Sequence, residues 1–258
     1  MDWKAFCCPE NEKPLEHLVD GYSNTSIFRT IGFIGDSLSS GEFESRDDAG
    51  EPGYHDYYEY SWGQYIARRN GLTAYNFSQG GMNARWYLES FADEKDFWAQ
   101  ELACQAYVIA LGVNDIVNQR CELGCAEDAD PEDYRRNRDT FAGRYAAIVS
   151  RYRQIQPQAK FFFVTMPRSD DDRDPLREAH AKLLYDLAER FGNAYVIDLY
   201  RYGPVNDAAY QEQFYLYGHL NASGYVFTAR MIDSYIDYII RHHPDDFRRV
   251  PFIGKGLK

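Results

Sequence analysis

Five short apolar segments recur along the chain, and each is nearly continuous rather than alternating with polar residues. They are Thr30–Gly35, Thr73–Phe77, Ala106–Leu111, Lys160–Thr165 and Ala194–Leu199. Strands that are buried on both faces have this pattern, because helices cover both sides of a parallel sheet. The pattern therefore predicts a five-stranded parallel sheet.

Helical spacing of apolar residues follows the third strand, the fourth and the fifth. Each of these segments begins at an aspartate or asparagine that can cap a helix, and in two of them a proline comes next. The expected extents are from Asp130 to Pro157, from Asp174 to Gly192 and from Asn221 to Ile239. Alternating strands and helices predict a three-layer α/β/α sandwich.

The length and composition fit one large domain. The chain has 258 residues, of which 45% are hydrophobic, so wholesale disorder is excluded. We expect an N-terminal extension over residues 1–28 that packs on a single domain over residues 29–258. With 28 Lys and Arg against 40 Asp and Glu, the net charge is −12. This charge argues against a nucleic acid or an anionic membrane as the main partner, and the sequence predicts no oligomeric state.

The N-terminal residues and the cysteines bear on the compartment. Met1–Tyr22 lacks the basic start and apolar run of a signal peptide. Five cysteines, an odd number, fit a reducing compartment, so we expect a cytoplasmic protein. Cys121 and Cys125, with Cys7 and Cys8, match zinc-ligand spacing poorly, and we predict no metal.

Candidate chemistry lies directly after the first three predicted strands, where ligands bind in such sheets. Ser37 follows the first strand, and a serine held there is a candidate nucleophile. The N–H groups of Ser37 and Gly81 and the side-chain amide of Asn114 are candidate donors to an oxyanion. His219 stands just before the last helix, where we expect it to reach the same edge as the base.

These residues lie in four segments that together resemble the GDSL/SGNH hydrolase superfamily of serine esterases and lipases. The segments are Gly35-Asp36-Ser37-Leu38, Asn76–Gly81, Leu111–Asp115 and Gly218–Tyr225. The resemblance implies a flavodoxin-like topology, Ser37 as nucleophile, His219 as base, and an oxyanion hole of Ser37, Gly81 and Asn114. It implies no cofactor, and we expect Asp36 and Asp115 to brace the loops as supporting residues.

One position departs from the family pattern. The family has an aspartate three residues before the histidine, which orients the imidazole, whereas this chain has Leu216. Three interpretations remain open. A backbone carbonyl near Leu216 or Tyr217 accepts from the ring, another carboxylate such as Glu212 or Asp207 substitutes, or the chain is a weak or inactive relative.

The segment Ser39–Tyr60 interleaves acidic and aromatic residues. It either overhangs the active site or forms a solvated acidic loop. With the resemblance, it favours a serine esterase that hydrolyses a short-chain acyl ester, acetyl above all, of a carbohydrate or another small polar alcohol. The alternatives are a thioesterase or lysophospholipase of the same fold, and a ligand-binding relative without catalysis, which Leu216 favours.

Overall fold

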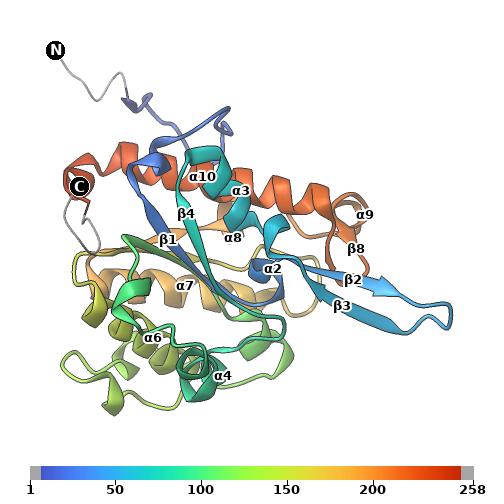
Figure 1. Cartoon of the computed structure of the whole chain (residues 1–258), viewed down its shortest axis with the longest axis horizontal. Helices are drawn as coiled ribbons and strands as arrows, with labels where there is room; N and C mark the ends of the chain where they lie inside the picture. The colour runs from blue at the N-terminus through green and yellow to red at the C-terminus, as the bar shows by residue number, and fades with distance from the viewer. Residues whose placement is uncertain (1–6, 251–258) are drawn as a thin grey trace.

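The computed structural model describes residues 7–250, and its centre is a five-stranded parallel sheet (Figure 1). The strand order is β4-β1-β5-β6-β7. The strands are β1 (Thr30–Gly35), β4 (Thr73–Ser78), β5 (Ala106–Ala110), β6 (Lys160–Val164) and β7 (Ala194–Ile197). The predicted fold class and all five predicted strands are confirmed.

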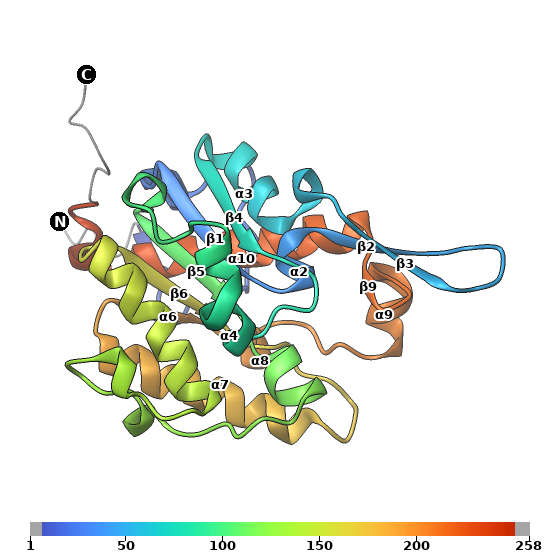
Figure 2. The same cartoon turned by 60° about the horizontal axis from the view of Figure 1, so that its bottom comes forward.

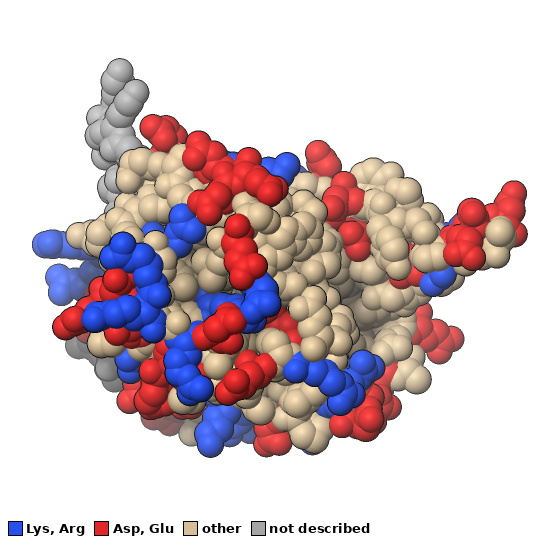
Figure 3. Space-filling model, turned by 90° about the horizontal axis from the view of Figure 1, so that it is seen from below, with Lys and Arg blue, Asp and Glu red and all other residues tan. Residues whose placement is uncertain are grey.

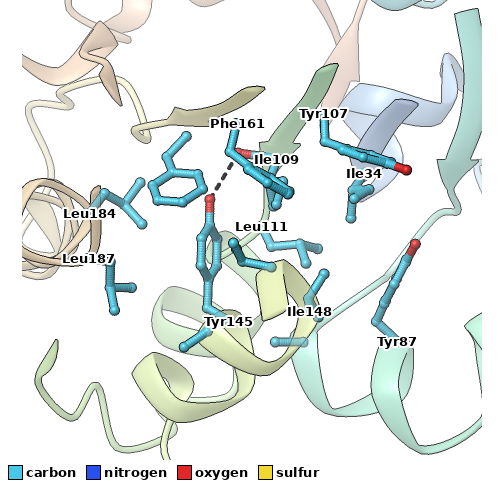
Figure 4. Packing of buried hydrophobic residues seen from close by; sticks show 14 of the residues in the cluster. Ile34, Tyr87, Tyr107, Ile109, Leu111, Tyr145, Ile148, Phe161, Leu184 and Leu187 are labelled. Carbon is cyan, nitrogen blue, oxygen red and sulfur yellow. Dashed lines mark hydrogen bonds between the residues drawn. The ribbon is translucent and has the colours of Figure 1, made fainter. Parts of the chain in front are cut away.

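Helices cover both faces of the sheet, so successive strand residues enter two different cores. Phe161 and Phe163 of β6 face one core, in which Tyr145 donates a hydrogen bond to the carbonyl of Ile109 at 3.3 Å (Figure 4). Phe162, between them, faces the other core. Burial on both faces is the physical reason that the strands are continuous apolar segments in the sequence.

The helices are α2 (Ser37–Ser40), α3 (Trp62–Asn70), α4 (Ala84–Trp86), α5 (Ala92–Glu94), α6 (Phe141–Ile155), α7 (Asp174–Phe191), α8 (Leu199–Tyr202), α9 (Ala208–Phe214) and α10 (Ala222–His242). Shorter 3-10 or π turns are η1 (Asn24–Ile27), η2 (Tyr58–Tyr60), η3 (Tyr87–Phe91), η4 (Gln100–Leu102), η5 (Val113–Asn118), η6 (Ala126–Asp128), η7 (Tyr134–Arg136) and η8 (Pro244–Phe247). Residues of α6 and α7 contribute to one core, and residues of α3 and α10 to the other.

The helix predicted to start at Asp130 starts later. Its first α-helical residue is Phe141, capped by Thr140, whose hydroxyl accepts from the Gly143 amide at 3.2 Å. The Asp130 carboxylate instead accepts from the amides of Glu132 and Asp133, which closes a local turn. Aspartate favours such turns as readily as helix caps, and for this reason the predicted start of the helix at Asp130 is wrong.

A β-hairpin projects from the domain beyond the carboxyl end of β1 (Figure 2). It consists of β2 (Glu42–Arg46) and β3 (Pro52–Asp56), and its tip carries Asp47, Asp48 and Glu51. The tip is exposed, whereas Glu42 and Glu44 at the base are buried. The segment predicted as a loop after the nucleophile is therefore a hairpin whose base belongs to the domain.

The described part of the predicted N-terminal extension lies along α10. Arg241 donates to both carboxylate oxygens of Glu12, at 2.7 and 2.8 Å, and the Val19 amide donates to Ser234 at 2.9 Å. Residues 1–6 of the predicted extension and residues 251–258 of the predicted domain lie outside the described residues.

Charges of both signs are interspersed over the lower face of the molecule, and acidic residues occupy the end of the projecting hairpin (Figure 3). No helix within residues 7–250 has the length and apolarity to cross a membrane. The five cysteines are free, and the described residues hold no cluster of side chains suited to a metal ion.

Candidate active site

Ser37 lies where β1 passes into the short helix α2. The Asp36 carboxylate caps this helix by accepting from the Leu38 amide at 3.1 Å. On the other side, the Tyr225 hydroxyl of α10 shares its proton between the Glu42 carbonyl at 2.6 Å and the Ser37 carbonyl at 3.3 Å. The backbone of Ser37 is thus held from two elements, while its side chain is partly exposed.

The two predicted supporting aspartates are buried and brace loops. Asp36 is 4% exposed, and burial raises its pKa to about 7 despite the hydrogen bond from Leu38. Asp115 is 1% exposed, accepts from the Ala84 amide at 2.9 Å, and has its pKa raised to about 6 by burial. Asp115 thereby ties the loop after β5 to the loop after β4.

The three candidate oxyanion donors, Ser37, Gly81 and Asn114, border one cavity. Gly81 has a φ of +73°, a conformation that glycine adopts without strain. One hydrogen of the Asn114 amide is donated to the Met82 carbonyl at 3.0 Å, which leaves the second hydrogen for a ligand. Within residues 7–250 the amides of Ser37 and Gly81 donate to no protein acceptor.

His219 reaches the same cavity, and its ring is oriented by a carboxylate that the sequence did not indicate. His219 belongs to the two-residue strand β9 (His219–Leu220), which pairs with β8 (Tyr215–Leu216). Its Nδ1 lies 3.2 Å from Glu44 Oε2, and the same oxygen accepts from the Gly218 amide at 2.9 Å. Glu44 therefore fixes both the ring and the backbone just before it.

This geometry answers the question that Leu216 raised. Leu216 is opposite His219 in the β8–β9 pair and is 45% exposed, and a carboxylate rather than a backbone carbonyl faces Nδ1. The carboxylate is Glu44 instead of the suggested Asp207 or Glu212. Asp207 caps α9 by accepting from the Tyr210 amide at 2.9 Å.

A second glutamate contacts the other ring nitrogen. Glu42 Oε1 lies 2.9 Å from His219 Nε2, the atom that would take a proton from Ser37. The second carboxylate oxygen lies against Gly80, where any Cβ would stand 2.0 Å from Glu42 Oε2. Gly80 thus leaves the space that the Glu42 side chain occupies.

The two glutamates change the titration of the histidine. The Glu42 carboxylate, as an acceptor at Nε2, is the largest cause that raises the pKa of His219 above its ordinary value. Burial acts in the opposite direction, and Glu44 adds to the effect of Glu42. Burial alone would raise the pKa of Glu44, but the Gly218 amide, His219 and Arg46 together hold it below its ordinary value. Both contacts to the ring are satisfied when both ring nitrogens carry protons, since an ionised carboxylate only accepts.

The cavity has a volume of about 700 Å³ and collects the candidate residues from all four sequence segments. Besides Ser37, Gly81, Asn114 and His219, its wall includes Glu42, Tyr54, Tyr217, Asp171, Arg173 and Arg177. Arg177 donates to both oxygens of Asp171, at 2.6 and 3.0 Å, so this basic side chain is already paired.

The sequence matches the model of the GDSL-like lipase/acylhydrolase family over residues 33–227, which includes every candidate site residue. The chain belongs to this family. The enzyme class predicted from the sequence, an ester hydrolase, is thereby confirmed at the level of the family. No curated protein sequence matches the chain.

Solved structures of this fold include several carbohydrate esterases. A family two carbohydrate esterase from Clostridium thermocellum, in complex with cellohexaose, is 17% identical, with a TM-score of 0.58 over 87% of this chain and 67% of that chain. A family 2 enzyme from Corynascus thermopiles, with a carbohydrate-binding domain, is 19% identical, with a TM-score of 0.53 over 86% of this chain and 68% of that chain. A family 3 carbohydrate esterase from Clostridium thermocellum is 12% identical, with a TM-score of 0.52 over 83% of this chain and 97% of that chain. At these identities the likeness establishes the fold.

Proposed function

We propose that the chain hydrolyses an ester through an acyl-enzyme on Ser37. The Ser37 hydroxyl attacks the ester carbonyl and passes its proton to Nε2 of His219. The N–H groups of Ser37 and Gly81 and the amide of Asn114 bind the oxyanion that forms. His219 then returns the proton to the leaving alcohol, and a water molecule, activated in the same way, releases the acid and restores Ser37.

The observation that carries this proposal is the meeting of these groups at one cavity, with His219 backed by Glu44 at 3.2 Å. Ser37 and His219 are 182 positions apart in the sequence, and packing alone does not require them to lie at the same cavity. Each has the chemistry that acyl transfer needs. In this scheme Glu44 is a positioning residue: it holds the imidazole in the tautomer whose Nε2 accepts a proton.

The acyl group is assigned to a second, largely apolar cavity of about 160 Å³. It shares Leu38 and Val113 with the site cavity, and these residues follow Ser37 and precede Asn114. Leu220, next to His219, lines it as well. A dry cavity of about 150 Å³ holds a benzene molecule, so this one fits short acyl tails from acetyl to about six carbons. The long chains of lysophospholipids exceed that volume.

The alcohol part of the substrate is assigned to the open cavity, where carboxylates, arginines and tyrosines offer hydrogen bonds to hydroxyl groups. Carbohydrate esterases share this fold, and one of them was solved with cellohexaose. These observations support a carbohydrate or another small polar alcohol as the alcohol part of the substrate.

A fluorophosphonate probe tests the proposed nucleophile. We expect one equivalent to react with the folded protein, with loss of fluoride and with the adduct on the peptide that contains Ser37.

One observation favours a second function, ligand binding without turnover, because Nε2 of His219 contacts Glu42 rather than Ser37. If the probe does not label Ser37 in the folded protein, and the protein still binds a carbohydrate, the second function is supported instead.

The apolar cavity gives a second prediction. Ala110 lines it at the end of β5, and Ala110→Leu places three further carbons there. We expect kcat/KM for p-nitrophenyl hexanoate to fall by about tenfold or more, since even one methylene in a filled pocket changes discrimination by about tenfold. The value for p-nitrophenyl acetate should change by less than about twofold.

Ala209→Leu, at an exposed position of α9, is the matched control and should leave both values unchanged. Equal losses for the two esters in Ala110→Leu, or no loss for the hexanoate while the variant keeps its melting temperature, would show that the acyl group binds elsewhere.

A further inference from the structure

Glu42 is a buried carboxylate that the proposed reaction does not use. It is 8% exposed, and the Tyr225 hydroxyl of α10 anchors its backbone carbonyl at 2.6 Å. From this anchor its side chain enters the site cavity and reaches Nε2 of His219. Within residues 7–250, His219 is the only ion-pair partner of Glu42.

The contact between Glu42 and His219 is incompatible with catalysis by His219. The nitrogen that must accept the Ser37 proton lies 2.9 Å from the Glu42 carboxylate, and when it carries the proton that this contact requires, it has no lone pair for Ser37. The Ser37 hydroxyl makes no hydrogen bond to any residue between 7 and 250. In this arrangement His219 does not serve Ser37, and Glu42 must leave Nε2 before Ser37 is activated.

The other oxygen of Glu42 indicates what removes it. Glu42 Oε2 lies against Gly80, directly before the oxyanion donor Gly81, and no described group donates a hydrogen bond to it. It borders the cavity assigned to the alcohol part of the substrate. An ionised acceptor in that position binds a hydroxyl group through a charge-assisted hydrogen bond.

We propose that Glu42 recognises a hydroxyl group next to the ester in the alcohol part of the substrate, and that this contact releases His219 for catalysis. The inference rests on the proposed esterase function and names its substrate class, an ester with a free neighbouring hydroxyl. When the hydroxyl donates to Glu42, the carboxylate moves away from Nε2, the Nε2 proton of the imidazolium passes to solvent water, and the lone pair left on Nε2 accepts the proton of Ser37.

Two further carboxylates near this pair are held by arginines. Glu44 pairs with Arg46, and Asp171 with Arg177. The Tyr54 ring meets the His219 ring edge-on, with centroids 5.6 Å apart. The remaining groups on the surrounding elements are Asp36, Asp56, Arg173, Tyr215, Tyr217 and Tyr225. Within residues 7–250 none of them is paired with the Glu42 carboxylate, so a ligand donor has no competitor there except His219.

Two esters that differ in a single donor test the proposal: 2-hydroxyethyl acetate and 2-methoxyethyl acetate. We expect the wild-type chain to hydrolyse the hydroxy ester with a kcat/KM about tenfold or more above that of the methoxy ester, the range of one hydrogen bond to a charged group. In Glu42→Ala this ratio should fall to about one, with a faster reaction of the methoxy ester, because His219 is no longer occupied.

The pH dependence of kcat/KM is a second test, because it would not change if Glu42 only supported the structure. Since Glu42 raises the pKa of His219, its removal lowers that pKa, and the neutral base exists at lower pH. The acid limb of kcat/KM for p-nitrophenyl acetate should therefore shift to lower pH in Glu42→Ala and in the isosteric Glu42→Gln. Glu51→Gln, at the exposed tip of the same hairpin, should change neither the ratio nor the profile.

A wild-type ratio near one, or a ratio that survives in Glu42→Ala, would overturn the recognition of the hydroxyl group while leaving the esterase intact. If the wild-type chain hydrolyses neither these esters nor p-nitrophenyl acetate, the esterase function itself fails.

Discussion

Ser37→Ala should lower the turnover of p-nitrophenyl acetate by about 10⁴-fold or more, because the acyl-enzyme cannot form without the hydroxyl. The cap of α2 involves the Asp36 side chain and the Leu38 amide, so the substitution leaves the hydrogen bonds of the nucleophile loop in place. The burst of p-nitrophenol, measured by stopped flow, should disappear together with the steady-state rate.

Ser150→Ala in α6 is the matched control and should retain full turnover, since it lies outside both cavities at the site. Turnover that persists undiminished in Ser37→Ala, with an unchanged melting temperature, would remove Ser37 from the mechanism and with it the acyl-enzyme.

The sheet was readable from the sequence because its central strands β1, β5 and β6 are buried on both faces. Phe161, Phe162 and Phe163 enter opposite cores in turn, and no polar residue interrupts them. The loops at the carboxyl ends of the strands follow from the same reading, because parallel strands bring those ends to one edge. Ser37, Gly81 and Asn114 follow three of these strands, so the sequence places them at one edge of the sheet, and they border one cavity there.

The carboxylates that contact His219 could not be predicted from the sequence, although the sequence pattern around them contains a signal. Glu42 and Glu44 alternate with Phe43, and residues two apart on a strand share a face. Phe43 packs on the Tyr225 ring, with centroids 5.2 Å apart, so the two carboxylates face the other way, toward His219. The alternation alone does not name the histidine, because the contact spans 175 positions and depends on how the hairpin leaves the domain. The expectation from the family placed the acid just upstream of the histidine, and here that position faces solvent.

Glu44→Gln should lower turnover by about 10²- to 10⁴-fold, close to the effect of losing the acid of a serine-protease triad. A glutamine amide next to Nδ1 can donate to it, which places the ring proton on Nε2 and leaves no acceptor for Ser37. Glu44→Asp, which keeps the charge, should recover part of the rate. Both are measured as kcat/KM for p-nitrophenyl acetate between pH 5 and pH 9.

The pH profile separates orientation of the ring from support of the loop, since Glu44 also accepts from the Gly218 amide. Glu44 raises the pKa of His219, so the acid limb should move to lower pH in Glu44→Gln, even as the plateau falls. Asp48→Asn at the hairpin tip should keep both the plateau and the limb. A plateau that falls without any shift, and that Glu44→Asp does not recover, would assign Glu44 to loop structure alone. A plateau equal to that of the wild-type chain would mean that His219 acts as the base without the Glu44 carboxylate.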